Sequence, residues 1–231
     1  MSRLDDIRKF YVILNQLNNS MGGPRRLLSC DGRFSWPQRG VYFFMEDGEA
    51  RSDSGQGPRI VRVGTHALKA QSSTTLWKRL SQHKGGEKSG RGNHRGSIFR
   101  LIVGTALNAD AAETCLTWGD KTAGRDVRAG ETALEEHVTR IIGRMPFLWL
   151  VIDDEPGPTS MRGYIERNAI ALLSNYGKPA IDPPSPDWLG HKCNREKVRV
   201  SGLWNQNHVD ESYDPAFLTR FEQLVDDARP A

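Results

Sequence analysis

Two short apolar runs, separated by a polar segment with several glycines, place the strongest constraint on what this chain can fold into. The first run, GVYFFMED at residues 40–47, is aromatic and ends at acidic turn residues. The second run, RIVRVGT at residues 59–65, is rich in β-branched residues and ends at a glycine and a threonine. Runs of this length are typical of strands, and the intervening GEARSDSGQGP is typical of a loop. The sequence therefore predicts a β-hairpin.

Apolar residues recur at helical spacing on both sides of this hairpin. Helices are expected over residues 3–18, 74–85, 131–145, 160–177 and 214–229. Ser2 and Ser160 are suitable N-caps for two of them. Residues 146–156 are typical of a buried strand, whereas the segment from 97 to about 130 fits either a strand or a helix. This order predicts an α+β fold with a small, mostly antiparallel sheet flanked by helices.

Composition narrows the class of protein. A chain of 231 residues and 25.9 kDa suits one large domain, and no apolar run approaches the length of a membrane span. The N-terminal segment is too acidic and too periodic for a signal peptide. Three cysteines, far apart and without zinc spacing, are typical of reduced thiols in a cytosolic protein. We therefore expect a cytoplasmic protein with no membrane partner.

Charge is distributed unevenly along the chain. The sequence has 32 basic and 28 acidic residues, a net charge of +4. The interval from Lys69 to Arg100 contains a single acid, Glu87. Its basic and histidine residues are Lys69, Lys78, Arg79, His83, Lys84, Lys88, Arg91, His94, Arg95 and Arg100. A solvated surface usually mixes both signs, so this one-signed cluster favours contact with phosphate groups.

Five polar residues occupy unusual places in the expected layout. Tyr42 lies in the first hairpin strand and Arg62 lies near the end of the second. Arg79 and His83 are one turn apart on a helix, and Glu166 lies within a late, largely apolar helix. Phosphodiester hydrolysis needs a carboxylate that holds a divalent metal, an arginine that neutralises charge, and a Tyr or His that takes a proton from water. These residue types match that requirement.

Taken in order, these segments resemble the GIY-YIG nucleases, and most closely the restriction-endonuclease-like members that share an Arg-x-x-x-His helix. Gly40-Val41-Tyr42 looks like the first motif, and Arg62-Val63-Gly64 stands where the second motif lies, with Arg62 replacing its tyrosine. LWKRLSQH looks like the Arg/His helix, and YIERNAI contains a glutamate that matches the family's metal ligand. The order agrees across residues 40–175.

The resemblance implies a metal-dependent endonuclease, most simply of a restriction or defence type. Glu166 would hold Mg²⁺ or Mn²⁺, Tyr42 with help from His83 would activate water, and Arg79 would stabilise the developing charge. Arg62 would face the site as a cationic substitute for the missing tyrosine.

The resemblance also suggests how the chain is divided. Residues 1–39 would form an N-terminal helix and connection, and residues 40–176 the nuclease core with an insertion at about 84–146. Residues 177–231 would form a C-terminal extension. This extension contains Asn205, the candidate for the asparagine that the family often carries after the glutamate, with Asn207 next.

Nucleic acid is the expected partner. Gly64 would leave room at the metal–phosphate site, and His66 is either a turn residue or part of the site rim. Further contacts are expected from Lys78, Lys84, His94 and Arg95, and from residues near 188–208.

Three questions stay open at this stage. DNA is the first expected substrate, with single strands or RNA as alternatives. A catalytically inactive nucleic-acid-binding module is the rival class, because Arg62 replaces the tyrosine of the second motif. Cleavage of both strands with one site per chain would require a homodimer or two successive nicks.

Overall fold

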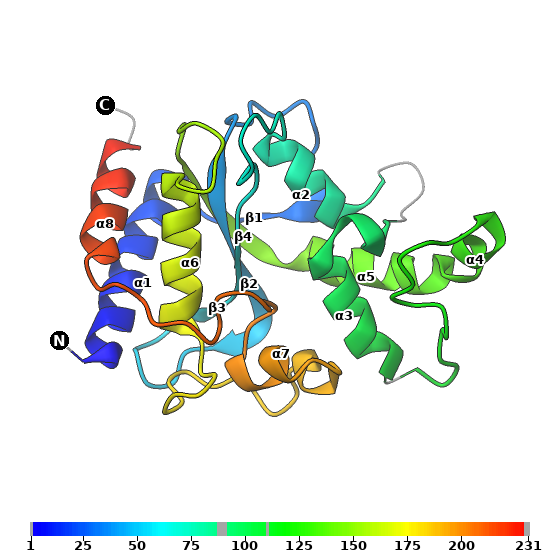
Figure 1. Cartoon of the computed structure of the whole chain (residues 1–231). Helices are drawn as coiled ribbons and strands as arrows, with labels where there is room; N and C mark the ends of the chain where they lie inside the picture. Colours follow the sequence, from blue (N-terminus) through cyan, green and yellow to red (C-terminus); the bar gives the residue numbers. More distant parts are fainter. Residues whose placement is uncertain (1, 87–91, 110, 229–231) are drawn as a thin grey trace.

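The computed structural model describes residues 2–86, 92–109 and 111–228. These residues form one four-stranded sheet in which every neighbouring pair is antiparallel, in the order β1-β4-β2-β3 (Figure 1). The strands are β1 (Arg25–Arg26), β2 (Gly40–Ala50), β3 (Pro58–Gly64) and β4 (Pro146–Val151). The predicted hairpin is confirmed as β2 and β3, in which Tyr42 lies opposite Gly64 and Phe44 opposite Arg62.

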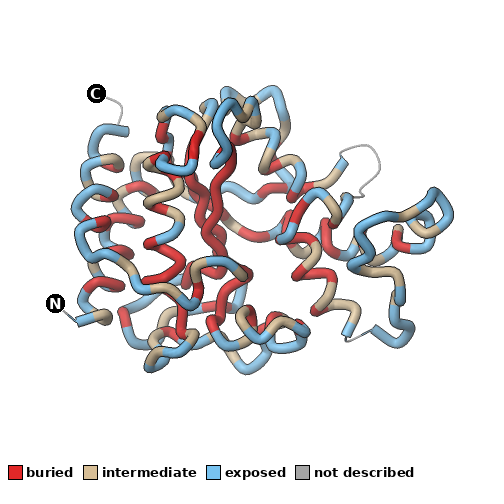
Figure 2. Tube along the Cα trace, in the orientation of Figure 1, coloured by how far each residue is buried: buried red, intermediate tan, exposed pale blue. Residues whose placement is uncertain are grey.

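Helices cover both faces of the sheet (Figure 1). One layer contains α1 (Arg3–Ser20), α6 (Met161–Leu173) and α8 (Phe217–Asp227). The other contains α2 (Leu76–Lys84), α3 (Ile98–Ala109) and α5 (Thr132–Arg144). Because side chains alternate along a strand, Val41 and Phe43 pack toward the first layer and Tyr42 and Phe44 toward the second. The central strands are therefore buried on both faces, as Figure 2 shows. The α+β class is confirmed.

The expected helix starts are confirmed at two positions. The Ser2 side chain accepts a hydrogen bond from the Asp5 amide at the start of α1, and Ser160 accepts one from Gly163 at the start of α6. Gly85 ends α2 with a φ of 90°, a conformation that favours glycine.

The ambiguous segment after residue 97 contains two helices joined by an irregular stretch. It forms α3, whose Ile102, Val103 and Ala106 pack into the core below the sheet, and it continues to the short helix α4 (Arg125–Gly130). The hydrophobic periodicity of a fully buried apolar run does not distinguish a strand from a helix. The helical conformation of this segment therefore follows from its tertiary packing. No helix in the described parts of the chain is both long and apolar enough to cross a bilayer.

The C-terminal region closes the exposed edge of the sheet. After α7 (Glu196–Ser201), the Trp204 amide donates to the Val61 carbonyl at 2.7 Å. The Asn205 side chain then pairs with Val63 of β3, accepting from its amide at 3.1 Å and donating to its carbonyl at 2.8 Å. The edge strand thus finds partners for its outward polar groups within the same chain.

Candidate active site

A cavity of about 400 Å³ opens beside the end of β3. Its walls come from β3, α2, α6, the start of α3 and the loop that follows α7. The lining residues are Arg62, Thr65, Leu68, Arg79, Ile98, Glu166, Ile170, Asn205, Gln206, Asn207 and His208. Four residues singled out from the sequence therefore meet here: Arg62, Arg79, Glu166 and Asn205.

Glu166 supplies the carboxylate of this cavity. Its Oε1 accepts a hydrogen bond of 3.0 Å from the Thr65 amide, and the Thr65 hydroxyl in turn donates to the Gly40 carbonyl at 2.8 Å. Within the described residues, Oε2 has no hydrogen-bond partner. Burial raises the pKa of Glu166, and the charge of Arg62 opposes that shift. The hairpin thus fixes one carboxylate oxygen of a residue that lines the cavity.

Arg62 is a buried cation held in one orientation. Its guanidinium donates to the Trp204 carbonyl and lies over the Phe99 ring, 4.6 Å from the centroid. Burial lowers its pKa, whereas the neighbouring Tyr42 and Glu166 side chains raise it. A guanidinium stays protonated under such conditions. Its Nε is buried without a hydrogen-bond partner in the described structure. Arg62 therefore presents a charge whose hydrogen-bonding capacity is incompletely used.

Arg79 brings a second positive charge to the cavity. It projects from α2 and donates to the side chain of Gln82 at 3.0 Å and to the Gly96 carbonyl at 3.3 Å. Its Nε is also buried without a partner, and no carboxylate of the described residues forms an ion pair with it. A half-buried arginine with neutral partners is well suited to bind an anion such as a phosphate.

Tyr42 and His83 lie beneath this cavity rather than in it. The Tyr42 hydroxyl is 2.9 Å from Nε2 of His83, and Nδ1 of His83 is 2.7 Å from the Ser97 hydroxyl. Both Tyr42 and His83 have 0% exposure, and neither lines the cavity. Burial, aided by the charges of Arg79 and Arg62, holds the pKa of His83 well below its usual value, so the imidazole is neutral. The expectation that these two side chains activate water stays a prediction, although neither of them lines this cavity.

Gly64 serves a different purpose from the expected one. A Cβ atom at this position would lie 2.5 Å from the Tyr42 ring and hydroxyl. The glycine therefore makes room for the cross-strand tyrosine rather than for a phosphate. The second-motif glycine and the first-motif tyrosine are a packing pair.

Two further expected site residues have structural partners. The Asn205 side chain lines the cavity and is held by Val63 through one bond at each amide atom, which leaves a second Nδ2 hydrogen and a second Oδ1 lone pair. His66 is 5% exposed, and its Nε2 donates to the Gln38 carbonyl at 3.3 Å. Burial lowers the pKa of His66 to about 4. His66 is therefore a neutral interior residue and not part of a rim.

Three members of the basic cluster that the sequence predicts, His94, Arg95 and Arg100, have carboxylate partners in the described structure. His94 is buried and 3.0 Å from a Glu135 oxygen, and Arg95 forms an ion pair of 2.6 Å with Glu131. Both glutamates belong to α5 or its N-terminal end. The expected nucleic-acid contacts of His94 and Arg95 stay a prediction, and both side chains have carboxylate partners in the described structure.

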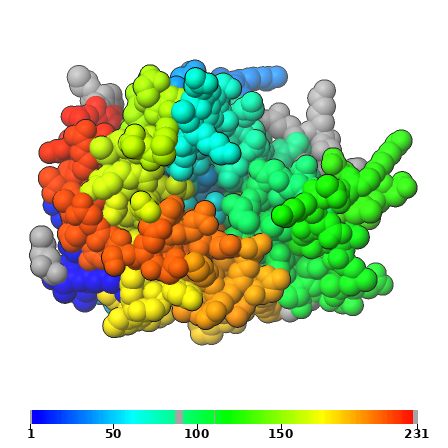
Figure 3. Space-filling view, in the orientation of Figure 1, coloured from blue at the N-terminus to red at the C-terminus, as the bar shows by residue number. Residues whose placement is uncertain are grey.

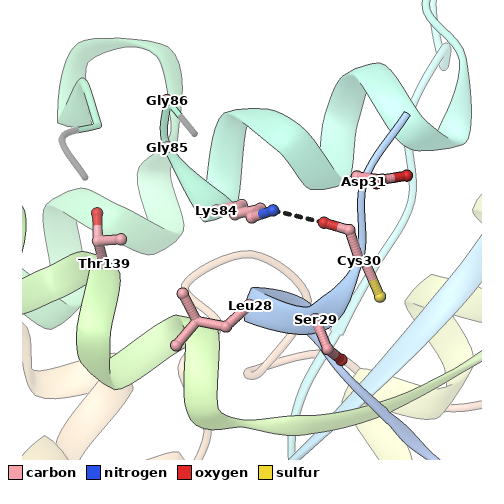
Figure 4. A pocket seen from close by; sticks show the side chains of 8 residues that line it. All are labelled: Leu28, Ser29, Cys30, Asp31, Lys84, Gly85, Gly86 and Thr139. Carbon is pink, nitrogen blue, oxygen red and sulfur yellow. Dashed lines mark hydrogen bonds between the residues drawn. The ribbon is translucent and has the colours of Figure 1, made fainter. Parts of the chain in front are cut away.

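Lys84 is also turned inward. Its ammonium donates to the Cys30 carbonyl beside a separate cavity of about 360 Å³, where Leu28 and Thr139 also lie (Figure 4). Lys78 stays exposed on α2. Lys88 and Arg91 lie outside the described residues.

His208 is a cavity residue that sequence reasoning included in the range 188–208 for nucleic-acid contact but did not single out for catalysis. Its Nδ1 lies 2.7 Å from Oε1 of Glu211, and its backbone has a φ of 64°. The signal in the sequence is weak, consisting of a histidine and a glutamate three residues apart in a polar loop. Thr65, which positions Glu166, and Ser97, which positions His83, were missed for the same reason: their partners are distant in the sequence.

The donor set fits a divalent cation of the magnesium type. Among the described residues, no three His, Cys, Asp or Glu side chains gather as a metal-binding group. Mg²⁺ is commonly held by one or two carboxylates and completes its shell with waters and substrate phosphates. Glu166, with one oxygen free and two arginines across the cavity, matches this pattern and does not match an all-protein zinc site.

One of the comparisons with known proteins gives a match. The model of the GIY-YIG domain matches residues 1–231, the whole chain. No match is found among curated proteins or among solved structures.

Proposed function

Because the chain belongs to the GIY-YIG domain family, and so has a nuclease-type fold, we propose that it is a metal-dependent endonuclease that cleaves phosphodiester bonds of DNA. A restriction or defence role is the most direct biological setting. The observation that carries the proposal is one cavity that Glu166, Arg62 and Arg79 line together, with Oε1 of Glu166 held by the Thr65 amide.

Each cavity residue has a distinct task in this proposal. Glu166 would hold Mg²⁺ or Mn²⁺, and such an ion would supply Lewis-acid stabilisation of charge on a phosphodiester. Arg79, half-buried and without a carboxylate partner, binds a non-bridging phosphate oxygen and neutralises the charge that grows in the transition state. Arg62 lies deeper and fixes the same phosphate from the side of the sheet. Preformed donors of this kind need no reorganisation during the reaction.

Tyr42 and His83 support the site from below. The Tyr42 hydroxyl joins β2 to α2 through His83, and α2 carries Arg79. Tyr42 is also a close neighbour of Arg62. We therefore assign Tyr42 and His83 to the positioning of the two arginines. Exposed Lys78, on the same helix, is placed to contact a nearby phosphate of the bound strand.

A nucleic-acid-binding module without catalysis is the second candidate. Arg62 in place of the second-motif tyrosine favours it, as does the burial of Tyr42 and His83 away from the cavity. Such a protein would bind nucleic acid in a salt-dependent way. It would not cleave the nucleic acid, and Glu166→Ala would make no difference.

The deciding experiment compares supercoiled plasmid, labelled single-stranded DNA and RNA as substrates, each with Mg²⁺, Mn²⁺ or EDTA. Glu166→Ala is the test variant. Glu222→Ala is the matched control, because Glu222 is a partly exposed carboxylate on α8 that pairs with Lys9.

Metal-dependent cutting that is lost only in Glu166→Ala supports the nuclease, and the substrate that is cut decides between DNA and RNA. Nicked plasmid would indicate cleavage of one strand, and linear plasmid would indicate cleavage of both strands. Cleavage of both strands would point to two cooperating copies of the chain. Binding without cutting in all three proteins supports the binding module.

A further inference from the structure

The cavity contains one more group capable of proton transfer, and the Tyr42–His83 pair is not that group. We propose that His208 accepts the proton of the attacking water, with Glu211 holding its imidazole in position. This inference rests on the proposed nuclease function and adds the residue that this function lacks.

The first step of the argument is elimination among the residues that line the cavity. Its titratable side chains are Arg62, Arg79, Glu166 and His208. A guanidinium does not give up its proton in proteins, so neither arginine can accept one. Glu166 is the metal ligand of the proposal. His208 is therefore the remaining lining residue with a lone pair for a proton.

The second step is the orientation of the imidazole. Nδ1 of His208 lies 2.7 Å from Oε1 of Glu211, which lies three residues later in the same loop. The other carboxylate oxygen of Glu211 accepts from Nε of Arg167 at 2.6 Å. A carboxylate accepts hydrogen bonds, so Nδ1 carries the hydrogen of the neutral ring and Nε2 carries the lone pair. The carboxylate also stabilises the imidazolium after proton transfer, as in other histidine–carboxylate pairs.

The third step is location. A second cavity of about 410 Å³ adjoins the first, and Leu68, Glu166 and His208 line both. Arg167, which fixes Glu211, directly follows Glu166 on α6. In Figure 3 the orange to orange-red segment around residues 200–215 lies directly beside yellow-green α6. His208 and Glu166 therefore line the same two adjoining cavities.

The backbone conformation of His208 is consistent with a functional role. His208 has a φ of 64°, in the left-handed region that few residues other than glycine adopt. Such conformations persist where surrounding contacts determine them, and they are frequent at active sites. Here Val209 is buried in the core on one side, and the Asn205–Val63 pairing anchors the chain on the other.

The chemical step is a hydrolysis. A lone pair of the water oxygen forms a bond to phosphorus while Nε2 of His208 takes one water proton. The bond from phosphorus to the leaving oxygen breaks, and its electron pair goes to that oxygen, which takes a proton from solvent water. The imidazolium then returns its proton to solvent. No oxidant or further reactant is needed.

The test measures cleavage and binding separately. His208→Ala is expected to lose roughly 100-fold or more in the single-turnover cleavage rate, the usual scale for a proton-transfer group. Binding of the same labelled DNA, measured by fluorescence anisotropy with Ca²⁺ in place of Mg²⁺, should stay within about twofold of wild type, because Arg62, Arg79 and Glu166 remain. Added imidazole should restore at least about tenfold of the lost rate. His137→Ala, which removes an exposed histidine of α5, is the matched control and should behave as wild type.

Glu211 is tested as a positioning residue. Glu211→Gln should slow cleavage by roughly tenfold in the wild-type background and have no further effect in the His208→Ala background, since it acts through the imidazole. A general structural role would reduce the rate equally in both backgrounds.

Three results would overturn the proposal. They are full activity in His208→Ala while Glu166→Ala is inactive, loss of DNA binding in His208→Ala, and loss of cleavage in His208→Ala that imidazole does not restore. In all three the nuclease function itself stands. Absence of cleavage by the wild-type protein on every substrate would instead overturn both proposals together.

Discussion

The Tyr42 hydroxyl lies 2.9 Å from Nε2 of His83, and both side chains are fully buried between β2 and α2. The two residues are 41 positions apart, so this hydrogen bond joins segments that local folding alone does not bring together. Neither residue lines the cavity. Loss of this hydrogen bond is therefore expected to lower the stability of the fold and to disturb the placement of Arg79.

Replacement of Tyr42 by phenylalanine should therefore destabilise the protein more than it impairs chemistry. The substitution leaves a buried imidazole nitrogen without a partner, which costs about 1–3 kcal/mol in the free energy of unfolding. Urea denaturation measures this loss, with Tyr176→Phe as the control, because no described residue hydrogen-bonds the Tyr176 hydroxyl. A fall in cleavage of 100-fold or more at full folding, without a loss of stability, would instead assign Tyr42 a direct role in proton transfer.

Gly64→Ala should also destabilise the fold, through a steric conflict. The new methyl group would lie 2.5 Å from the Tyr42 ring, which belongs to the neighbouring central strand. Overpacking of this kind costs about 1–3 kcal/mol. The control is Gly130→Ala, where nothing lies within 4 Å of an added Cβ atom. Equal midpoints of thermal unfolding for the two variants would contradict the assigned packing role.

Arg79→Ala should weaken nucleic-acid binding and reduce its salt dependence. Removal of one phosphate contact lowers the magnitude of the slope of log K against log salt by about one. Arg220→Ala removes an exposed arginine of α8, which is bonded to Gln223, and should leave the slope unchanged. The measurement is a salt titration of binding affinity. An unchanged slope in Arg79→Ala would remove this residue from the interface.

Glu166→Gln should stabilise the metal-free protein at neutral pH. Burial raises the pKa of this carboxyl above its ordinary 4.5, so the folded state disfavours the carboxylate more than the unfolded state does. The resulting destabilisation is present above the folded pKa and disappears as the pH falls through it. Thermal unfolding across pH 4–8 should show the largest difference between variant and wild type at the high end.

The same pair of proteins tests the metal. A saturating ion at 100 times its dissociation constant stabilises the folded state by about 2.7 kcal/mol, so Mn²⁺ should raise the unfolding temperature of wild type but not of Glu166→Gln. Glu222→Gln should respond as wild type. An equal shift in all three proteins would place the ion elsewhere.

Glu135→Gln is expected to be among the most destabilising single changes in the molecule. Glu135 contacts both Arg100, at 2.6 Å, and His94, at 3.0 Å, in the interior. Loss of one partner of a buried ion pair costs about 3–5 kcal/mol. Although burial raises the pKa of Glu135, the hydrogen bond from His94 and the charge of Arg100 outweigh it and lower the pKa. Its stabilising contribution is therefore complete above the unfolded value near 4.5 and is lost as the pH falls through the lower, folded value. Acid unfolding monitored by circular dichroism checks both statements.

The sequence predicts the hairpin and the capped helices well because their signals are local. The alternation and turn residues around Tyr42 and Arg62, and the serines before α1 and α6, act within a few positions along the chain. The α3 segment was ambiguous because a fully buried run lacks a polar face.

The site was only partly predictable because its electrostatics depend on distant partners. The interval around His94 and Arg95 contains almost only positive charge in sequence, yet Glu131 and Glu135 reach it from more than 35 residues away. Burial of Tyr42 and His83 likewise follows from the packing of α2 on the sheet. Four of the expected catalytic residues do line one cavity, because strand register and helix phase fix where their side chains emerge.

The segment that covers the edge of β3 also forms part of the cavity wall. Trp204 and Asn205 occupy the backbone groups through which a bare edge would recruit another sheet, and the next three residues form a wall of the cavity. A chain cut short before this segment would bare the edge of β3 and remove one wall of the cavity. Selection for a protein that stays dispersed in solution would thereby also preserve the tail that completes the site.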